Sequence, residues 1–151
     1  RIGGGVILLF GGGILLGDLA KQTGLTSAWG AELVELTGAH SMWAIVALCT
    51  GVAIVLSEAT SNTATSVLMA PLAASLAVAA GHSPVPAVLG ATIGSSFGFM
   101  MPISTAPNAM AYGTGKVTMG QMMRTGIVFD VVGFVVVVAG LRLVCPLLDL
   151  A

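Results

Sequence analysis

Two short polar clusters interrupt the apolar sequence of this chain, and both are rich in uncharged oxygen atoms. The first lies within "SEATSNTATSVLMAP", residues 57–71, and the second within "PISTAPNAMAYGTGK", residues 102–116. Hydroxyl and amide groups offer oxygen ligands to a hard monovalent cation, and a broken helix adds free backbone carbonyls. Helix N-termini at such breaks also favour anions. If the two clusters face each other, they predict a neutral cup for a cation beside donors for an anion.

The candidate ligands are the short polar side chains of the two clusters. They are Ser57, Thr60, Ser61, Asn62 and Thr63 in the first cluster, and Ser104, Thr105 and Asn108 in the second. The same residue types also cap helices and form hydrogen bonds between membrane helices, and each residue taken alone fits that role better. The two breaks taken together favour a binding site, because broken helices in membrane carriers mark such sites.

Glu58 is the one acidic residue in the segment that contains the first cluster. A carboxylate at membrane depth is a functional candidate by default. It can assist a cation, be neutralised, or reach a partner elsewhere in the protein, and we interpret it as structural. The sequence offers no further acid at either break, which argues against proton coupling. Asp130 and Arg124 are six positions apart and do not share a helical face, so we expect no local pair.

The composition is that of a membrane protein. The 151 residues are 56% hydrophobic and 7% charged, with a mean hydropathy of +1.04, whereas about a quarter of the residues in a soluble domain are charged. The five basic residues are scattered, which argues against nucleic acid as a partner. Cys49 and Cys145 lie in apolar runs and are interpreted as small buried hydrophobes. No nucleophile–base pair or metal-ligand set is evident, so we do not expect an enzyme.

The chain divides into two predicted parts. Residues 1–38 combine an apolar membrane segment with an amphipathic helix in the membrane interface. Residues 39–151 contain a hairpin at 39–80, a broken helix at 84–115 and a final span at 120–146. The two apolar arms of the hairpin fit either two spans joined by a loop or a re-entrant hairpin. We prefer the re-entrant hairpin because its tip is almost uncharged.

The helix boundaries follow from the same pattern. Pro84 and Pro86 are able to start a helix. We expect this helix to cover residues 86–101 and to break at residues 102–108, where prolines cannot sustain it. The break in the hairpin is expected at residues 57–63, where short polar side chains can bond to the freed backbone groups.

The two clusters and their surroundings closely resemble the divalent-anion/sodium symporter family of the ion transporter superfamily. "SNTATSVLMAPLAASLA" (61–77) is followed after a turn by "GSSFGFMMPISTAPNAMAYGTG" (94–115), and "LLFGGGILLGDLAKQTGL" (8–25) resembles the family's segment before its second hairpin. The resemblance covers nearly the whole chain. It implies an all-α membrane protein: half of an inverted-repeat transporter, with a re-entrant helical hairpin and a discontinuous transmembrane helix.

The resemblance also implies roles for individual residues. Sodium would be held by Ser57, Thr60, Asn62 and a backbone carbonyl near Ser104, and the substrate would be bound by Ser61, Asn62, Thr63, Thr105, Pro107 and Asn108. Many family members have a proline where this chain has Ala106, so the substrate contact there differs. The family further implies a homodimer in which the hairpin and broken helix move together across the bilayer as an elevator.

Our leading hypothesis is the C-terminal half of a sodium-coupled symporter, with Na+ as the coupled ion and a di- or tricarboxylate or similar divalent anion as substrate. Its partners would be the lipid bilayer and the N-terminal half, and its location would be the cell membrane, as a multi-pass protein of a bacterial inner membrane. Two alternatives stay open. One is a membrane-embedded half-unit that does not transport and needs a partner chain. The other is a carrier of the same superfamily coupled to another ion.

Overall fold

The computed structural model describes residues 41–150 and a few isolated positions before them, namely 15, 19, 22–24, 28 and 32. The membrane segment and interfacial helix predicted for residues 1–38 therefore lie almost entirely outside the described residues. Within residues 41–150 the chain is helical and has no strand. Its helices are α3 (Met42–Ala59), α4 (Asn62–Ala79), α5 (Pro84–Gly94), α6 (Ala106–Gly113) and α7 (Met119–Leu147).

Helices α3 and α4 are separated by a short break at Thr60 and Ser61. Helix α3 begins after Ser41, whose side chain accepts a hydrogen bond from the N–H of Ala44, and it ends where Thr60 becomes extended. The side chain of Ser61 then caps α4 by accepting from the N–H of Ala64. The predicted helix break within residues 57–63 is thus confirmed.

Helix α5 is shorter than the sequence predicts. It begins at Pro84, as expected from the prolines, but it ends at Gly94 rather than at residue 101. The prediction of a helix over 86–101 is wrong, because the backbone N–H groups of Phe99, Met100 and Met101 bind a side chain of another helix instead of helical carbonyls. The second break accordingly covers residues 95–105.

Helices α6 and α7 follow this second break. Thr105 caps α6 by accepting from the N–H of Asn108. Thr118 and Gln121 form a reciprocal capping box at the start of α7. Helix α7 runs from Met119 to Leu147 and so contains the whole of the predicted final span at 120–146.

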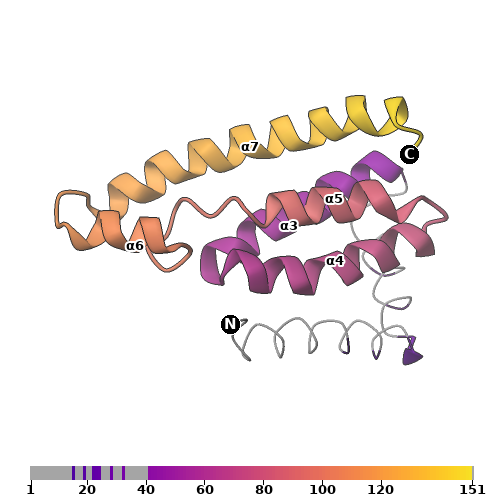
Figure 1. Cartoon of the computed structure of the whole chain (residues 1–151), viewed down its shortest axis with the longest axis horizontal. Coiled ribbons are helices and arrows are strands. Elements are labelled where there is room, and N and C mark those ends of the chain that lie inside the picture. Colours follow the sequence, from indigo (N-terminus) through magenta and orange to yellow (C-terminus); the bar gives the residue numbers. More distant parts are fainter. Residues whose placement is uncertain are drawn as a thin grey trace, which may run out of the picture.

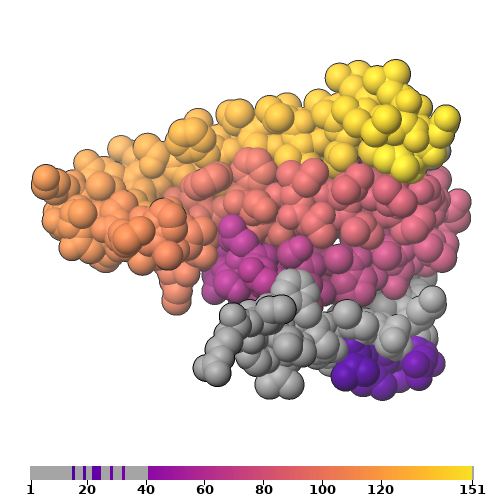
Figure 2. All heavy atoms as spheres, viewed as in Figure 1, coloured from indigo at the N-terminus to yellow at the C-terminus, as the bar shows by residue number. Residues whose placement is uncertain are grey.

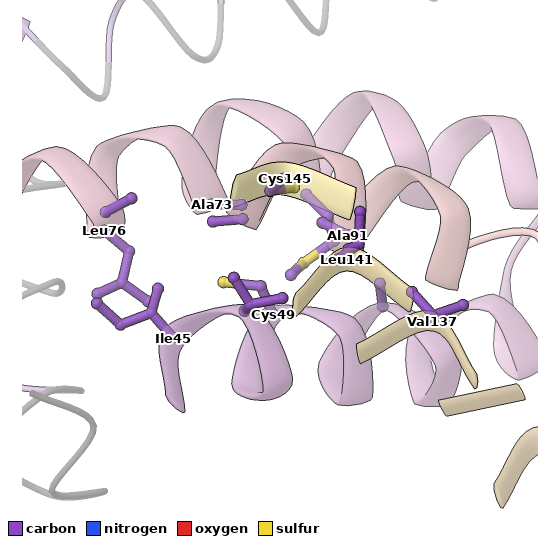
Figure 3. Close-up of a cluster of buried hydrophobic side chains, with 13 residues drawn as sticks. Ile45, Cys49, Ala73, Leu76, Ala91, Val137, Leu141 and Cys145 are labelled. Atoms are coloured by element: carbon purple, nitrogen blue, oxygen red, sulfur yellow. The ribbon is translucent and has the colours of Figure 1, made fainter. Parts of the chain in front are cut away.

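Helices α3 and α5 are the central elements of the described part, since they contact each other and each also contacts α4 and α7 (Figure 1). The close approach of α5 to α3 depends on glycine: a Cβ at Gly94 would lie 2.9 Å from the carbonyl oxygen of Thr50. Figure 3 shows the core where the four helices meet. Its labelled side chains are Ile45 and Cys49 of α3, Ala73 and Leu76 of α4, Ala91 of α5, and Val137, Leu141 and Cys145 of α7. Both cysteines are buried in this core, which confirms their interpretation.

Within residues 41–150, three helices are long and apolar enough to cross a membrane: α3, α4 and α7. Helix α7 runs along one edge of the molecule, in orange to yellow in Figure 2. Its apolar side chains are largely exposed there, as with Val135 (56%) and Val136 (62%). An apolar helix exposed in this way is compatible with lipid and not with water. The described part is therefore that of an all-α membrane protein.

Candidate functional site

The two helix breaks meet at Gly98, a buried glycine in the second break. A Cβ built on Gly98 would lie 2.0 Å from the hydroxyl oxygen of Ser104 and 3.1 Å from the carbonyl oxygen of Ser57. It would also lie 3.3 Å from Oδ1 of Asn62. Three oxygen atoms from separate parts of the chain therefore surround one Cα, and only glycine leaves room for them. We call this group of atoms the Gly98 oxygen cluster.

The Gly98 oxygen cluster has more acceptors than protons. The hydroxyl of Ser104 donates to the carbonyl oxygen of Ser57 at 2.8 Å. The hydroxyl of Ser57 carries one proton, yet it faces two carbonyl oxygens, those of Ile54 at 2.8 Å and of Phe97. Oδ1 of Asn62 is buried and has no hydrogen-bond partner. Buried oxygens short of donors are what a hard cation requires of its ligands.

Asn108 and Thr105 connect α6 to the same region. Nδ2 of Asn108 donates to the carbonyl oxygens of Gly98 at 2.8 Å and of Met101 at 3.1 Å. Nδ2 of Asn62 lies 3.4 Å from the carbonyl oxygen of Ser96. Amide groups of α4 and α6 thus both bind backbone carbonyls of the second break. The N-termini of α4 and α6, which favour anions, begin beside them.

The other predicted site residues are placed less centrally. The hydroxyl of Thr60 bonds within the hairpin, to the carbonyl oxygen of Leu56 at 2.9 Å and to Oγ1 of Thr65 at 2.6 Å. Ser61 is exposed, and its side chain caps α4. Thr63 and Pro107 are also exposed, near the starts of α4 and α6. The structure thus brings Ser57, Asn62, Ser104 and Asn108 together around Gly98.

Glu58 links the first break to the second through hydrogen bonds. Its carboxylate is buried and accepts hydrogen bonds from three consecutive backbone N–H groups. Oε1 accepts from Phe99 at 2.8 Å and from Met100 at 3.0 Å, while Oε2 accepts from Met100 and Met101 at 3.0 Å each. Successive N–H groups that converge in this way form a cradle for an anion, here a side chain. The geometry agrees with the structural interpretation of Glu58.

Asp130 of α7 reaches the same place, and the expectation of no further acid at the breaks is wrong. Asp130 is buried, and its carboxyl group interacts with that of Glu58, although neither of its oxygens has a hydrogen-bond partner. Helix α7 approaches closely because Gly126 and Gly133 flank Asp130 on its buried face. A Cβ at Gly126 would lie 2.5 Å from the backbone nitrogen of Met100. The spacing 126–130–133 was the available signal, since it places an acid between two glycines on one helical face.

Apolar helices that break around a buried polar cluster are the organisation of secondary membrane transporters. The comparisons agree with this class. Residues 2–148 match the family described as the sodium:sulfate symporter transmembrane region, and the chain therefore belongs to this family, the one that the sequence motifs resemble.

Relatives with curated descriptions point the same way. A sodium-dependent dicarboxylate transporter of Staphylococcus saprophyticus is 34% identical over 142 residues, which is 94% of this chain and 27% of the relative. A protein with the same description from Staphylococcus aureus is 33% identical over 95% of this chain and 27% of its own length. An uncharacterized transporter of Haemophilus influenzae is 34% identical over 88% of the chain and 29% of its own length. The chain thus spans less than a third of the length of these relatives. Its family and its apolar helices identify it as a multi-pass protein of the cell membrane.

Proposed function

We propose that this chain is the C-terminal part of a sodium-coupled symporter for di- or tricarboxylates or a similar divalent anion. Family membership and the descriptions of the staphylococcal relatives support this function. The observation that carries it is the Gly98 oxygen cluster, in which Oδ1 of Asn62 is buried without a donor beside oxygens of Ser57 and Ser104. Because 27% of a relative is matched, the transporting unit would include further parts, among them the N-terminal half.

Sodium would enter as a transported ion and be held by the Gly98 oxygen cluster. Its ligands would come from Ser57, Asn62 and Ser104, with Thr60 contributing from the break between α3 and α4. Oxygen ligands without a carboxylate suit a monovalent cation, since a full negative charge in the site is not needed to balance it. The charge of Glu58 would stay in its own cradle of N–H groups rather than on the ion.

The anion would bind beside sodium, at the N-termini of α4 and α6. The proposed substrate contacts are Ser61, Asn62, Thr63, Thr105, Pro107 and Asn108. Helix N-termini carry partial positive charge, and the side-chain amides and hydroxyls add donors for carboxylate oxygens. Ala106 offers no polar side chain, so its side chain would shape the site without binding the anion.

The organisation we propose for the transporting unit follows the family. Residues 1–38 would belong to the scaffold and residues 39–151 to the moving domain, one of two inverted repeats, in a homodimer. The hairpin at 39–80 would be re-entrant, with its tip inside the bilayer. Cysteines introduced at His40 and His82 should then react with an impermeant reagent from the same side of the membrane. Reaction from opposite sides would exclude the hairpin.

The proposed function is tested by uptake into proteoliposomes that contain the full-length carrier. Labelled succinate, citrate and sulfate should be compared with and without a sodium gradient. Asn62→Asp should lose substrate binding more than sodium binding, because it replaces the NH₂ donor by a charge that repels the anion by several kcal/mol at an effective dielectric of about 20. Ser57→Ala should mainly weaken sodium binding.

Thr114→Ala is the matched control, since the Thr114 hydroxyl is exposed and bonds to its own helix. Normal sodium-driven uptake by Asn62→Asp would contradict the site. Uptake that ignores sodium would favour a carrier coupled to another ion, and no uptake of any anion would favour a half-unit that does not transport.

A further inference from the structure

Asp130 and Glu58 form a buried pair of acids that the proposed transport site does not use. Glu58 comes from α3 and is 3% exposed, and Asp130 comes from α7 and is 5% exposed. Asp130 lies one turn after Gly126 on the buried face of α7, and a Cβ at Gly126 would lie 2.5 Å from the backbone nitrogen of Met100, so the carboxyl group of Asp130 meets that of Glu58 at residues 99–101. The two carboxyl groups differ in their surroundings. All the N–H groups of the cradle point at Glu58, whereas both oxygens of Asp130 lack a partner.

This difference decides which acid can hold a proton. Hydrogen bonds from three backbone N–H groups stabilise the carboxylate of Glu58. Asp130 has no donor to stabilise a negative charge, and a buried carboxylate without donors is strongly disfavoured. Two like charges side by side in a poorly hydrated site are disfavoured further. A proton on Asp130 relieves both penalties and turns one unpaired oxygen into a donor.

The surroundings offer no cation as an alternative. Helices α4 and α5 and the stretch 95–105 have no titratable residue. On α3 the single acid or base besides Cys49 is Glu58, and on α6 there is the exposed Tyr112. On α7 itself Arg124 is exposed and Asp130 has no hydrogen bond to it, and Arg142 lies three turns further on. Within these helices and the second break, the charge of a second carboxylate would therefore be unbalanced.

We propose that Asp130 is a proton-binding site, which holds its proton against the carboxylate of Glu58 and so locks α7 to the cradle formed by residues 99–101. The lock places the second break against α3, next to the Gly98 oxygen cluster. When the pH rises far enough, the proton leaves to water and two negative charges face each other. The contact between α7 and the second break then weakens. This site is separate from sodium and substrate binding and does not depend on what the carrier transports.

Asp130→Asn provides the test, because an asparagine donates to Glu58 at every pH and cannot titrate. In the full-length carrier in detergent, the melting temperature of the wild type relative to this variant should fall as the pH rises. The proton on Asp130 holds the contact between α7 and the cradle, so the stability that this contact contributes is present in acid and is lost as the pH rises and the proton leaves. The equilibrium constant for unfolding changes by at most about tenfold per pH unit for one proton.

Asp149→Asn is the matched control, because Asp149 is exposed and its φ of 53° suits asparagine as well. It should follow the wild-type profile. Infrared difference spectra between the wild type and Asp130→Asn, recorded at the acid end of the pH range in which their stabilities differ, should also show the carbonyl band of one protonated carboxylic acid. If Asp130→Asn does not accumulate, Asp130→Ser keeps a hydroxyl donor and replaces it in both measurements. Parallel pH profiles for wild type and variant, or spectra without that band, would overturn the proposal, whatever the uptake assays show.

Discussion

The two helix breaks contribute to the site in opposite ways. The break at Thr60 and Ser61 is short, and its own hydroxyls close the helix ends beside it. The side chains just before and after it, Ser57, Glu58 and Asn62, extend to the other break. The break at 95–105 is long and contributes mainly backbone: carbonyl oxygens at Phe97 and Gly98 and N–H groups at 99–101. Apart from Ser104, whose hydroxyl donates to the carbonyl oxygen of Ser57, one break supplies side chains and the other supplies the main chain that receives them.

We expect the largest effect from a substitution that places a side chain against the main chain of the second break. Gly126→Ala would place a Cβ 2.5 Å from the backbone nitrogen and 2.6 Å from the Cα of Met100. Backbone atoms cannot rotate away, so α7 or the second break must shift, which costs up to about 3 kcal/mol. We expect a large drop in the melting temperature of the full-length carrier and loss of sodium-driven uptake.

Gly120→Ala is the control for this change, since nothing lies within 4 Å of a Cβ there and both glycines belong to α7. It should leave the melting temperature unchanged or raise it slightly, because alanine favours a helix. Equal stability of the two variants would mean that α7 does not press on the second break.

The difference between the breaks explains what the sequence could predict. The first break is predicted by the residue types of Ser61, Asn62 and Thr63, and the structure places it there. The second break was expected at 102–108, where Pro102 and Pro107 stand, although it begins at Ser95. Residues 97–101 are apolar, and nothing in their side chains reveals that their backbone binds Glu58. The role of Asp130 was missed because the spacing of Gly126, Asp130 and Gly133 marks a buried face of α7 but does not show which segment packs against it.

Glu58→Gln should have the next largest effect, because it removes the anion from the cradle. The glutamine keeps one acceptor oxygen, and its NH₂ group opposes N–H groups of residues 99–101. Leaving a buried donor unsatisfied costs about 1–3 kcal/mol, and at least one is left here. The free energy of unfolding should therefore fall by about 2 kcal/mol. Sodium-dependent substrate binding should weaken with it, if the cradle positions the second break.

The check is a thermal melt combined with a sodium titration of substrate binding, with Asp149→Asn as the exposed acid-to-amide control. A variant with wild-type stability would show that the main chain of the second break holds its place without a side chain from the first. That result would remove the contrast between the two breaks.

Gly98→Ala should separate ligand binding from stability. The new Cβ would meet the hydroxyl of Ser104 at 2.0 Å, and this side chain is able to rotate. The rotation would break its hydrogen bond to the carbonyl oxygen of Ser57, worth about 1 kcal/mol. The Gly98 oxygen cluster would lose its geometry, so the sodium concentration for half-maximal uptake should rise by at least about tenfold, or 1.4 kcal/mol.

Gly113→Ala is the control here, because a Cβ at this position meets nothing within 4 Å. A large loss of stability in Gly98→Ala with unchanged sodium dependence would mean that this cluster is a packing contact only. The fold would then depend on the second break alone, and not on the contact between the two breaks at Gly98.

The smallest effect concerns Ser61, for which capping and substrate binding are competing roles. The side chain of Ser61 accepts a hydrogen bond from the backbone N–H of Ala64, in the first turn of α4, at 3.2 Å. Ser41 makes the same contact with Ala44 at 3.3 Å, at the start of α3. Replacing a cap by alanine costs about 1 kcal/mol, so Ser61→Ala and Ser41→Ala should lower the melting temperature by similar small amounts. If Ser61 also binds the anion, Ser61→Ala alone should raise the KM for substrate, while its melting temperature still matches that of Ser41→Ala. Equal KM values for Ser61→Ala and Ser41→Ala would mean that Ser61 only caps α4. Ser57, Glu58 and Asn62 would then be the residues around the first break that act beyond their own helix ends.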